Sequence, residues 1–284
     1  MIMTSSARPQ RIASLSTEAV DVLYRLGAQD RLVGISGFTV YPPQARHEKP
    51  KISGFSTGKL EKILAVAPDL VVGYSKVQRK LLDECEQAGV ATLCFDHRSL
   101  GGINDMVRTL GNLVDKAEQA EHLVAHLEGI KARVALAASH LPFKPRVYFE
   151  EWHSPLTCGI QWVSELIELA GGEDVFADLA LRDPFSARAV TPEQVLQARP
   201  QLILGAWCGQ RFDVDKVEAR PGFAALEATM LEMPSSDVLA PGPVAIERGL
   251  LAVFAAIAAC AGTTPAQLGL DPAFATVFSD PTAY

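Results

Sequence analysis

The chain of 284 residues is 48% hydrophobic and 21% charged, a composition that excludes a largely disordered protein. Its net charge of −7 argues against a nucleic-acid partner, which would require a basic face. The five cysteines are scattered, odd in number and without a CxxC pair, so the sequence predicts small buried thiols instead of a zinc knuckle or a disulfide framework.

The first half of the chain alternates short apolar runs with helical patterns, which is typical of an α/β architecture with mainly parallel sheets. We expect a helix over 17–30, capped by Thr17 and ended by Gly27. Further helices are predicted over 60–67 and 78–89. Strands are predicted at 11–16, 31–36, 69–75 and 90–96.

A long helix is predicted from Asp115 to about Ala138, because Leu123, Leu127, Ile130 and Val134 recur at helical spacing. Its length would be roughly 35 Å. Pro142 and Pro145 then break the chain. We therefore predict an N-terminal α/β lobe over 1–114, a connecting helix over 115–140 and a C-terminal α/β lobe over 141–284.

The second half repeats the order of the first. The segment "LEKILAVAPDLVVG" at 60–73 returns as "PEQVLQARPQLILG" at 192–205. Strands are predicted at 146–152 and 201–207, with helices over 161–176, ended by Gly171–Gly172, and over 191–200. The longest apolar run, 250–262, is too short to span a bilayer and predicts a buried helix. Two related α/β lobes with a ligand cleft between them follow from this order.

Aromatic and polar side chains gather directly after the predicted strands, although aromatic residues make up only 7% of the chain. Ligands of open parallel sheets bind beyond the carboxyl ends of the strands, so we take these residues as candidates for ligand contact. Several rings at one edge would suit a broad, flat, partly apolar ligand. The strand-end candidates are Phe38, Tyr41, Tyr74, Trp152, His153 and Trp207.

The order of these motifs resembles the helical-backbone solute-binding proteins of ABC importers, nearest to the cobalamin-binding members. "YPP" at 41–43, "LEKI" at 60–63, "LTCG…ELIELAGGEDVF" at 156–176 and "TPEQVLQARPQLIL" at 191–204 carry the resemblance. It implies two Rossmann-like lobes joined by one rigid helix, a single ligand in the cleft and no enzymatic activity. It also implies a periplasmic or other extracytoplasmic location.

The resemblance further assigns roles to individual residues. Glu61 and Glu193 match the acidic residues that dock each lobe on a membrane permease, and both fall in a first helical turn, where a carboxylate also favours the helix dipole. The expected ligand-contacting aromatic residues are Tyr41, Phe55 and Tyr74 in the first lobe and Trp152 and Phe185 in the second. The strand-end analysis adds Trp207 and His153, the latter as a polar contact or a ligand of a metal centre.

The protein is therefore predicted to bind a corrinoid (cobalamin or a related compound) and to deliver it to an ABC permease. No covalent cofactor is expected. Haem and ferric siderophores remain alternative ligands. A cytoplasmic corrinoid or haem carrier is a second reading, because "MIMTSSARPQR" lacks a signal-peptide pattern unless a leader was removed. A tetrapyrrole chelatase using His97, His153, Glu150 and Glu151 is disfavoured, since no nucleophile motif, phosphate loop or HExxH spacing occurs. His122 and His126 are expected to be a solvated surface pair.

Overall fold

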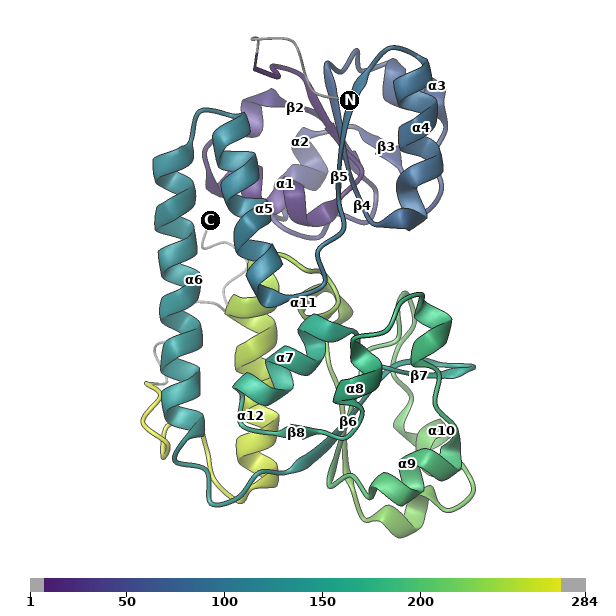
Figure 1. The fold of residues 1–284 in the computed structure, drawn as a ribbon, viewed down its shortest axis with the longest axis vertical. Coiled ribbons are helices and arrows are strands. Elements are labelled where there is room, and N and C mark those ends of the chain that lie inside the picture. The colour runs from purple at the N-terminus through teal and green to yellow at the C-terminus, as the bar shows by residue number, and fades with distance from the viewer. Residues whose placement is uncertain (1–7, 272–284) are drawn as a thin grey trace. The chain divides into compact units, whose positions relative to one another are not determined.

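The computed structural model describes residues 8–271, which form two compact units. Within this range the first unit comprises residues 8–97 and 101–126, and the second comprises residues 98–100 and 127–271. Each unit has its own sheet with helices packed against it (Figure 1), so the predicted two-lobe α/β fold is confirmed. The predicted limits at 114 and 140, and the ligand cleft, stay predictions.

The first unit contains a five-stranded parallel sheet in the order β3-β2-β1-β4-β5. Its strands are β1 (Ile12–Ser14), β2 (Leu32–Ser36), β3 (Lys51–Ser53), β4 (Leu70–Tyr74) and β5 (Ala91–Phe95). Its helices are α1 (Thr17–Arg25), α2 (Ala45–Glu48), α3 (Leu60–Leu64), α4 (Arg79–Gln87) and α5 (Leu100–Leu113), with 3₁₀ turns η1 (Gln29–Arg31) and η2 (Lys76–Gln78).

The first sheet is buried on both faces, which is the usual state of a parallel sheet. On one face Ile12 and Val72 join a cluster with residues of α1 and α5. On the other face Ala13 and Val71 pack with Ile63 of α3 and with α4. Figure 1 shows the two helix layers on either side of the strands. The hydrophobic runs of β1 and β4 therefore supply both cores at once.

The four strands predicted in the first half are confirmed, but β3 and α5 were not predicted. Strand β3 has three residues, too few to give a period-2 pattern. Helix α5 contains Gly101, Gly102 and Gly111, residues of low helix propensity that interrupt its apolar pattern. Burial of Met106, Val107 and Leu110 stabilises this helix in spite of its glycines.

The predicted cap of α1 is off by one residue. Ser16, not Thr17, is the N-cap, since its side chain accepts a hydrogen bond from the backbone N–H of Ala19 at 3.2 Å. Gly27 does follow the helix, at φ +68°, as predicted for a residue just past a helix end. The helix itself ends at Arg25 and is shorter than expected.

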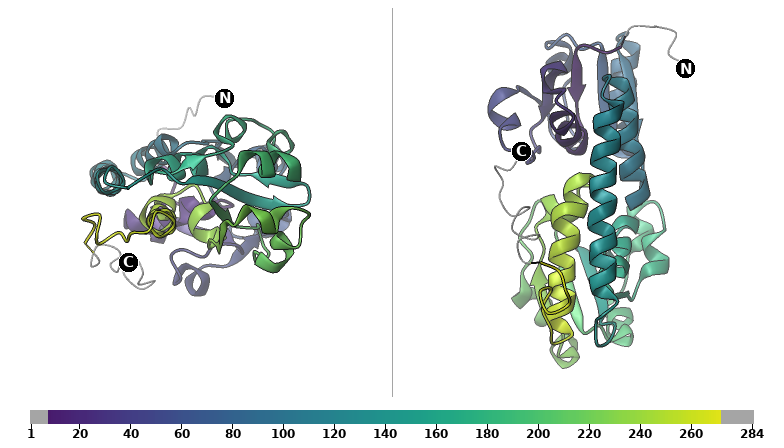
Figure 2. Two further views of the ribbon diagram at one scale, coloured as in Figure 1. Left: turned by 90° about the horizontal axis from the view of Figure 1, so that it is seen from below. Right: turned by 90° about the vertical axis from the view of Figure 1, so that its left-hand side faces the viewer.

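The predicted long helix is α6 (Ala117–Ala138), and it begins in the first unit and ends in the second. Of its predicted stripe, Leu127, Ile130 and Val134 are buried and Leu123 is half-buried. His122 and His126 are exposed, as predicted. The second-unit portion of α6 lies beside α12 (Leu250–Cys260) in both Figure 1 and Figure 2.

The second unit contains a sheet in the order β10-β9-β6-β7, with β8 also paired to β6. Its strands are β6 (Arg146–His153), β7 (Leu156–Cys158), β8 (Glu173–Asp174), β9 (Leu202–Gly205) and β10 (Thr229–Glu232). Its further helices are α7 (Gln161–Leu169), α8 (Ala177–Ala180), α9 (Pro192–Ala198), α10 (Val214–Glu218) and α11 (Ser235–Val238), with 3₁₀ turns η3 (Phe185–Arg188) and η4 (Phe223–Leu226) and a π-helical turn at Ala245–Gly249.

All pairings of this second sheet are parallel except the β6–β7 hairpin. Tyr148 of β6 belongs to a buried cluster with Val195 of α9 and Val217 of α10. Helix α12 is buried along most of its length, which confirms the prediction for the apolar run. In the part of the chain that the structure describes, no helix combines the length and apolarity needed to cross a bilayer.

Helix α7 ends at Leu169 with Gly171 at φ +83° just beyond it, so the predicted glycine end of this helix is confirmed. One sequence prediction needs correction. Cys208 is exposed, whereas the sequence predicted buried thiols; Cys85 and Cys158 are buried, and Cys94 and Cys260 are half-buried.

The carboxyl ends of the first sheet are tied together by one buried side-chain amide. Gln78, 3% exposed, accepts a hydrogen bond from the Tyr74 N–H at 2.8 Å. Its amide nitrogen donates to the carbonyl oxygens of Leu15 at 3.1 Å and of Phe55 at 2.8 Å. These three partners follow or end β1, β3 and β4, so Gln78 fixes the loops at this edge relative to one another.

We expect Gln78→Leu to lower the free energy of unfolding of the first unit by about 2–3 kcal/mol, because it leaves buried backbone groups without partners. Hydrogen exchange of first-unit amides and urea denaturation measure the loss. Gln119→Leu, at an exposed position of α6, is the matched control and should change stability by no more than about 0.5 kcal/mol. Equal effects of the two substitutions would contradict this assignment.

Candidate functional site

A row of four rings lies at the carboxyl ends of β6 and β9 in the second unit, with two rings in β6 and two after β9. The rings of Trp152 and His153 are stacked, with centroids 4.9 Å apart and planes 29° apart. His153 in turn contacts Trp207 at 4.5 Å, and Trp207 meets Phe212 edge-on at 5.1 Å. We call Trp152, His153, Trp207 and Phe212 the aromatic row. Three of its four members were predicted as strand-end candidates.

The members of the aromatic row differ in depth. Trp152 and His153 are half-buried, while Trp207 is 2% exposed and belongs to the core. The His153 Nε2 lies 3.3 Å from the Gln210 side-chain oxygen, and the Trp152 Nε1 donates to the Ser154 carbonyl at 2.9 Å. Trp152 and His153 thus present the accessible surface, and Trp207 lies beneath it as support.

Glu150 of β6 lies under Trp207 and is completely buried. Its carboxylate accepts two hydrogen bonds from Arg220, at 2.5 and 2.8 Å, and one from the Trp207 indole Nε1 at 3.0 Å. Burial, followed by the negative charge of Glu150, raises the pKa of the neighbouring Tyr148 well above its ordinary value. The Tyr148 phenol therefore stays neutral at physiological pH.

Phe185 is an exposed ring carried by the 3₁₀ turn η3. It lies over the guanidinium of Arg188, 5.1 Å from the ring centroid, an arrangement that favours cation–π attraction. Arg188 is itself buried and donates two hydrogen bonds to Glu151, at 2.6 and 3.0 Å. The ion pair with Glu151 of β6 therefore fixes Arg188, and Arg188 in turn contacts the ring of Phe185.

The first unit exposes several apolar side chains at the carboxyl edge of its sheet, and three of them are considered as a surface. Phe38 follows β2, Phe55 follows β3 and Val77 lies in the 3₁₀ turn after β4, and all three are exposed. Tyr41 is half-buried in the loop after β2. We call Phe38, Phe55 and Val77 the apolar edge. Phe55 was predicted from the resemblance and Phe38 from its place after a strand, whereas Val77 was not predicted.

Tyr74 offers little surface to a ligand. It is 8% exposed, and its hydroxyl donates to the His97 carbonyl oxygen at 2.6 Å. Its ring packs edge-on against the His97 ring, with centroids 5.2 Å apart. Tyr74 therefore holds the end of β4 against the segment after β5.

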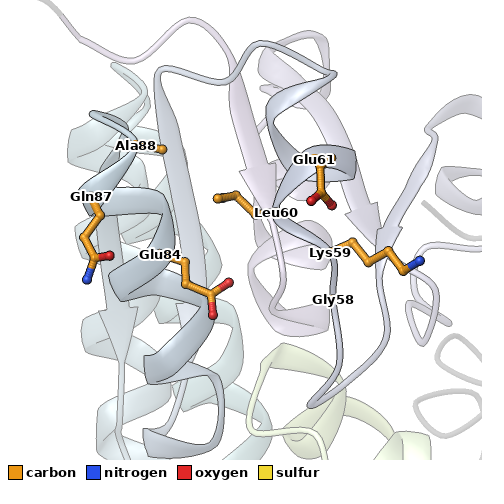
Figure 3. A pocket seen from close by; sticks show the side chains of 7 residues that line it. All are labelled: Gly58, Lys59, Leu60, Glu61, Glu84, Gln87 and Ala88. Atoms are coloured by element: carbon orange, nitrogen blue, oxygen red, sulfur yellow. The ribbon is translucent and has the colours of Figure 1, made fainter.

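Glu61 is exposed in the first turn of α3 and lines a groove of about 830 Å³. In Figure 3 its carboxylate lies on the α3 side of this groove and that of Glu84 lies on the α4 side. The remaining lining residues are Gly58, Lys59, Leu60, Gln87 and Ala88. An exposed carboxylate in such a groove is sterically available to a basic side chain of a partner.

Glu193 is exposed in the first turn of α9, where Thr191 forms a capping box with Gln194 and Pro192 takes the first helical position. The Glu193 pKa is lowered by a hydrogen bond with its own backbone and then by one with Thr191. The Glu193 carboxylate is therefore ionised at neutral pH.

The groups required for catalysis are not assembled around these residues. Glu150 and Glu151, two candidates of the chelatase reading, are each paired with an arginine. Burial raises the pKa of Cys158 to about 12, so its thiol is not a nucleophile at neutral pH. Within residues 8–271, no three His, Cys, Asp or Glu side chains are grouped so that they could hold a metal ion.

The sequence analysis did not identify Gln78, Phe212, Arg188 or Arg220 as parts of these surfaces. Arg220 lies 70 residues from Glu150 and Arg188 lies 37 residues from Glu151, so no local pattern connects the partners. Gly205 at the end of β9 could have pointed to Phe212. A Cβ at position 205 would lie 1.9 Å from the Phe212 ring, so the strand end requires glycine. A glycine ending an apolar strand can mark such a close approach.

The sequence comparisons agree on a single family. The model of the family described as periplasmic binding protein matches residues 12–230. A vitamin B12-binding protein of Vibrio vulnificus (strain CMCP6) is 28% identical over 209 residues, which cover 71% of this chain and 73% of that protein.

Solved structures share the fold at lower sequence identity. The periplasmic haem-binding protein RhuT from Roseiflexus sp. RS-1 matches with a TM-score of 0.73 and 22% identity, over 89% of this chain and 99% of that one. The periplasmic vitamin B12 binding protein BtuF of Vibrio cholerae matches with a TM-score of 0.71 and 21% identity, over 89% and 98%. The chain belongs to the periplasmic binding protein family, and it is a solute-binding protein, not an enzyme.

Proposed function

We propose that this protein binds a corrinoid, cobalamin or a close relative, outside the cytoplasmic membrane and delivers it to the permease of an ABC importer. The observation that carries the proposal is the aromatic row, which offers Trp152 and His153 as a flat, partly apolar surface. The vitamin B12-binding relatives support this choice of ligand.

The apolar edge of the first unit is proposed as a second ligand-contacting surface. Burying an aromatic side chain fully is worth about 1.5–3 kcal/mol, so a few rings suffice for tight binding before the costs of ordering are subtracted. Phe38, Phe55 and Phe185 are exposed and have apolar surface left to bury.

Haem is the second candidate ligand, because the imidazole of His153 is at the surface and can serve as an iron ligand. In this structure, however, the Nε2 of His153 lies within hydrogen-bond distance of Gln210. Ligation of a metal through this nitrogen would require that contact to break. We therefore place a polar contact by His153 ahead of metal ligation.

Titration of the purified protein with cyanocobalamin, cobinamide, haemin and ferric chelates tests the ligand. We expect corrinoids to bind, and Phe185→Ala to weaken that binding by about tenfold through loss of buried ring area. Phe143→Ala is the matched control, since Phe143 is 44% exposed and Phe185 is 43% exposed. Absorbance and calorimetry report the affinity. Failure of every corrinoid to bind would refute the proposed ligand.

Glu61 and Glu193 are proposed to dock the two units on basic side chains of the permease. Glu61→Gln and Glu193→Gln should each weaken binding to vesicles that carry the ABC importer of the same genome, while ligand affinity stays unchanged. Each loss should shrink at high salt, since exposed charge pairs are screened. Glu118→Gln, an exposed first-turn carboxylate of α6, is the control. Vesicle binding equal to that of the unsubstituted protein would refute the docking assignment.

A further inference from the structure

The aromatic row packs over the buried carboxylate of Glu150, which is inaccessible to a ligand at the surface. Glu150 is 0% exposed, and the side chain of its partner Arg220 is 16% exposed. Two neutral residues would avoid the cost of removing both charges from water, and a buried ion pair is therefore weak evidence for a role in stability. The geometric contribution of the pair is a fixed hydrogen-bond acceptor for the buried Trp207 indole N–H.

One carboxylate oxygen of Glu150 serves two donors. Oε1 accepts from an Arg220 nitrogen at 2.8 Å and from the Trp207 indole Nε1 at 3.0 Å, while Oε2 accepts from the other Arg220 nitrogen at 2.5 Å. The bidentate Arg220 contact fixes the plane of the carboxylate. Because the indole has a single N–H donor, this bond sets the direction in which the Trp207 ring points.

The orientation of Trp207 in turn affects the two accessible rings, His153 and Trp152. The Trp207 ring meets Phe212 edge-on at 5.1 Å and contacts the His153 ring at 4.5 Å. His153 is stacked on Trp152 at 4.9 Å. A rotation of the Trp207 indole would therefore remove the support of the two accessible rings.

We infer that Glu150 is a positioning residue for the aromatic row, which acts by fixing the indole of Trp207, while Arg220 neutralises its buried charge. The effect on ligand binding rests on the proposed function, but the orientation of the rings can be measured in the free protein. Two double variants differ in one feature. Glu150→Leu/Arg220→Met removes the acceptor, and Glu150→Gln/Arg220→Met keeps a side-chain oxygen for the Trp207 N–H.

In the free protein, we expect the Trp207 indole N–H to show hydrogen-bonded NMR shifts and slow solvent exchange in the unsubstituted and Gln variants. In the Leu variant the exchange should become fast, and the near-UV circular dichroism of the row should fall. A Leu variant with the same indole exchange and circular dichroism as the Gln variant would overturn the inference. If the Leu variant does not fold, Glu150→Met/Arg220→Met replaces it: Met is closer in shape to Gln but offers no oxygen acceptor, so fast indole exchange supports the inference and exchange equal to that of the Gln variant overturns it.

With cyanocobalamin and haemin as probes, the Leu variant should bind the accepted probe about tenfold more weakly than the Gln variant, a difference of ~1.4 kcal/mol. This difference should vanish in a Trp207→Phe background if Glu150 acts through the indole. A difference that persists there would overturn the proposed route. Val195→Ala, in the same buried cluster, controls for a general loss of stability and should leave affinity unchanged. If the unsubstituted protein binds neither probe, the proposed function loses its support while the free-protein measurements still decide the inference.

Discussion

The burial of parallel strands on both faces is the constraint from which the candidate surfaces follow. The two faces of β1 and β4 pack against different helices, so the side chains within the strands are committed to the cores. Residues that are free to meet a ligand are therefore expected at the carboxyl ends of the strands or in the loops that follow them. Phe38 and Phe55 of the first unit lie in such loops, and the half-buried Trp152 and His153 are the last two residues of β6.

Buried polar groups help to hold the carboxyl ends of the strands and the loops that follow them. In the first unit the amide of Gln78 joins the ends of three strands. In the second unit, Glu150 and Glu151 each bind an arginine from a distant loop. Directional hydrogen bonds specify an orientation, which hydrophobic contact alone does not. The surfaces proposed for ligand contact would keep their orientation through such anchors.

The fold could be predicted from sequence where hydrophobic periodicity was long enough to be seen. Helix α6 and strands β4, β6 and β9 were found in this way. Helix α5 was missed because its stability comes from tertiary burial of Met106 and Leu110 in spite of three glycines. Strand position also located Trp152 and Trp207 correctly, but their depth depends on residues far along the chain. Trp207 and Tyr74 are consequently more buried than a strand-end aromatic residue was expected to be.

The shared oxygen of Glu150 has an evolutionary consequence. Loss of Glu150 alone would leave a guanidinium and an indole N–H in the core without their acceptor, and loss of Arg220 alone would leave an unneutralised carboxylate. Neither intermediate sequence is favourable, so positions 150, 207 and 220 should be inherited as a unit. Descendants that adapt to new ligands would then diversify at Phe38, Phe55 and Phe185, while this triplet persists unchanged beneath them.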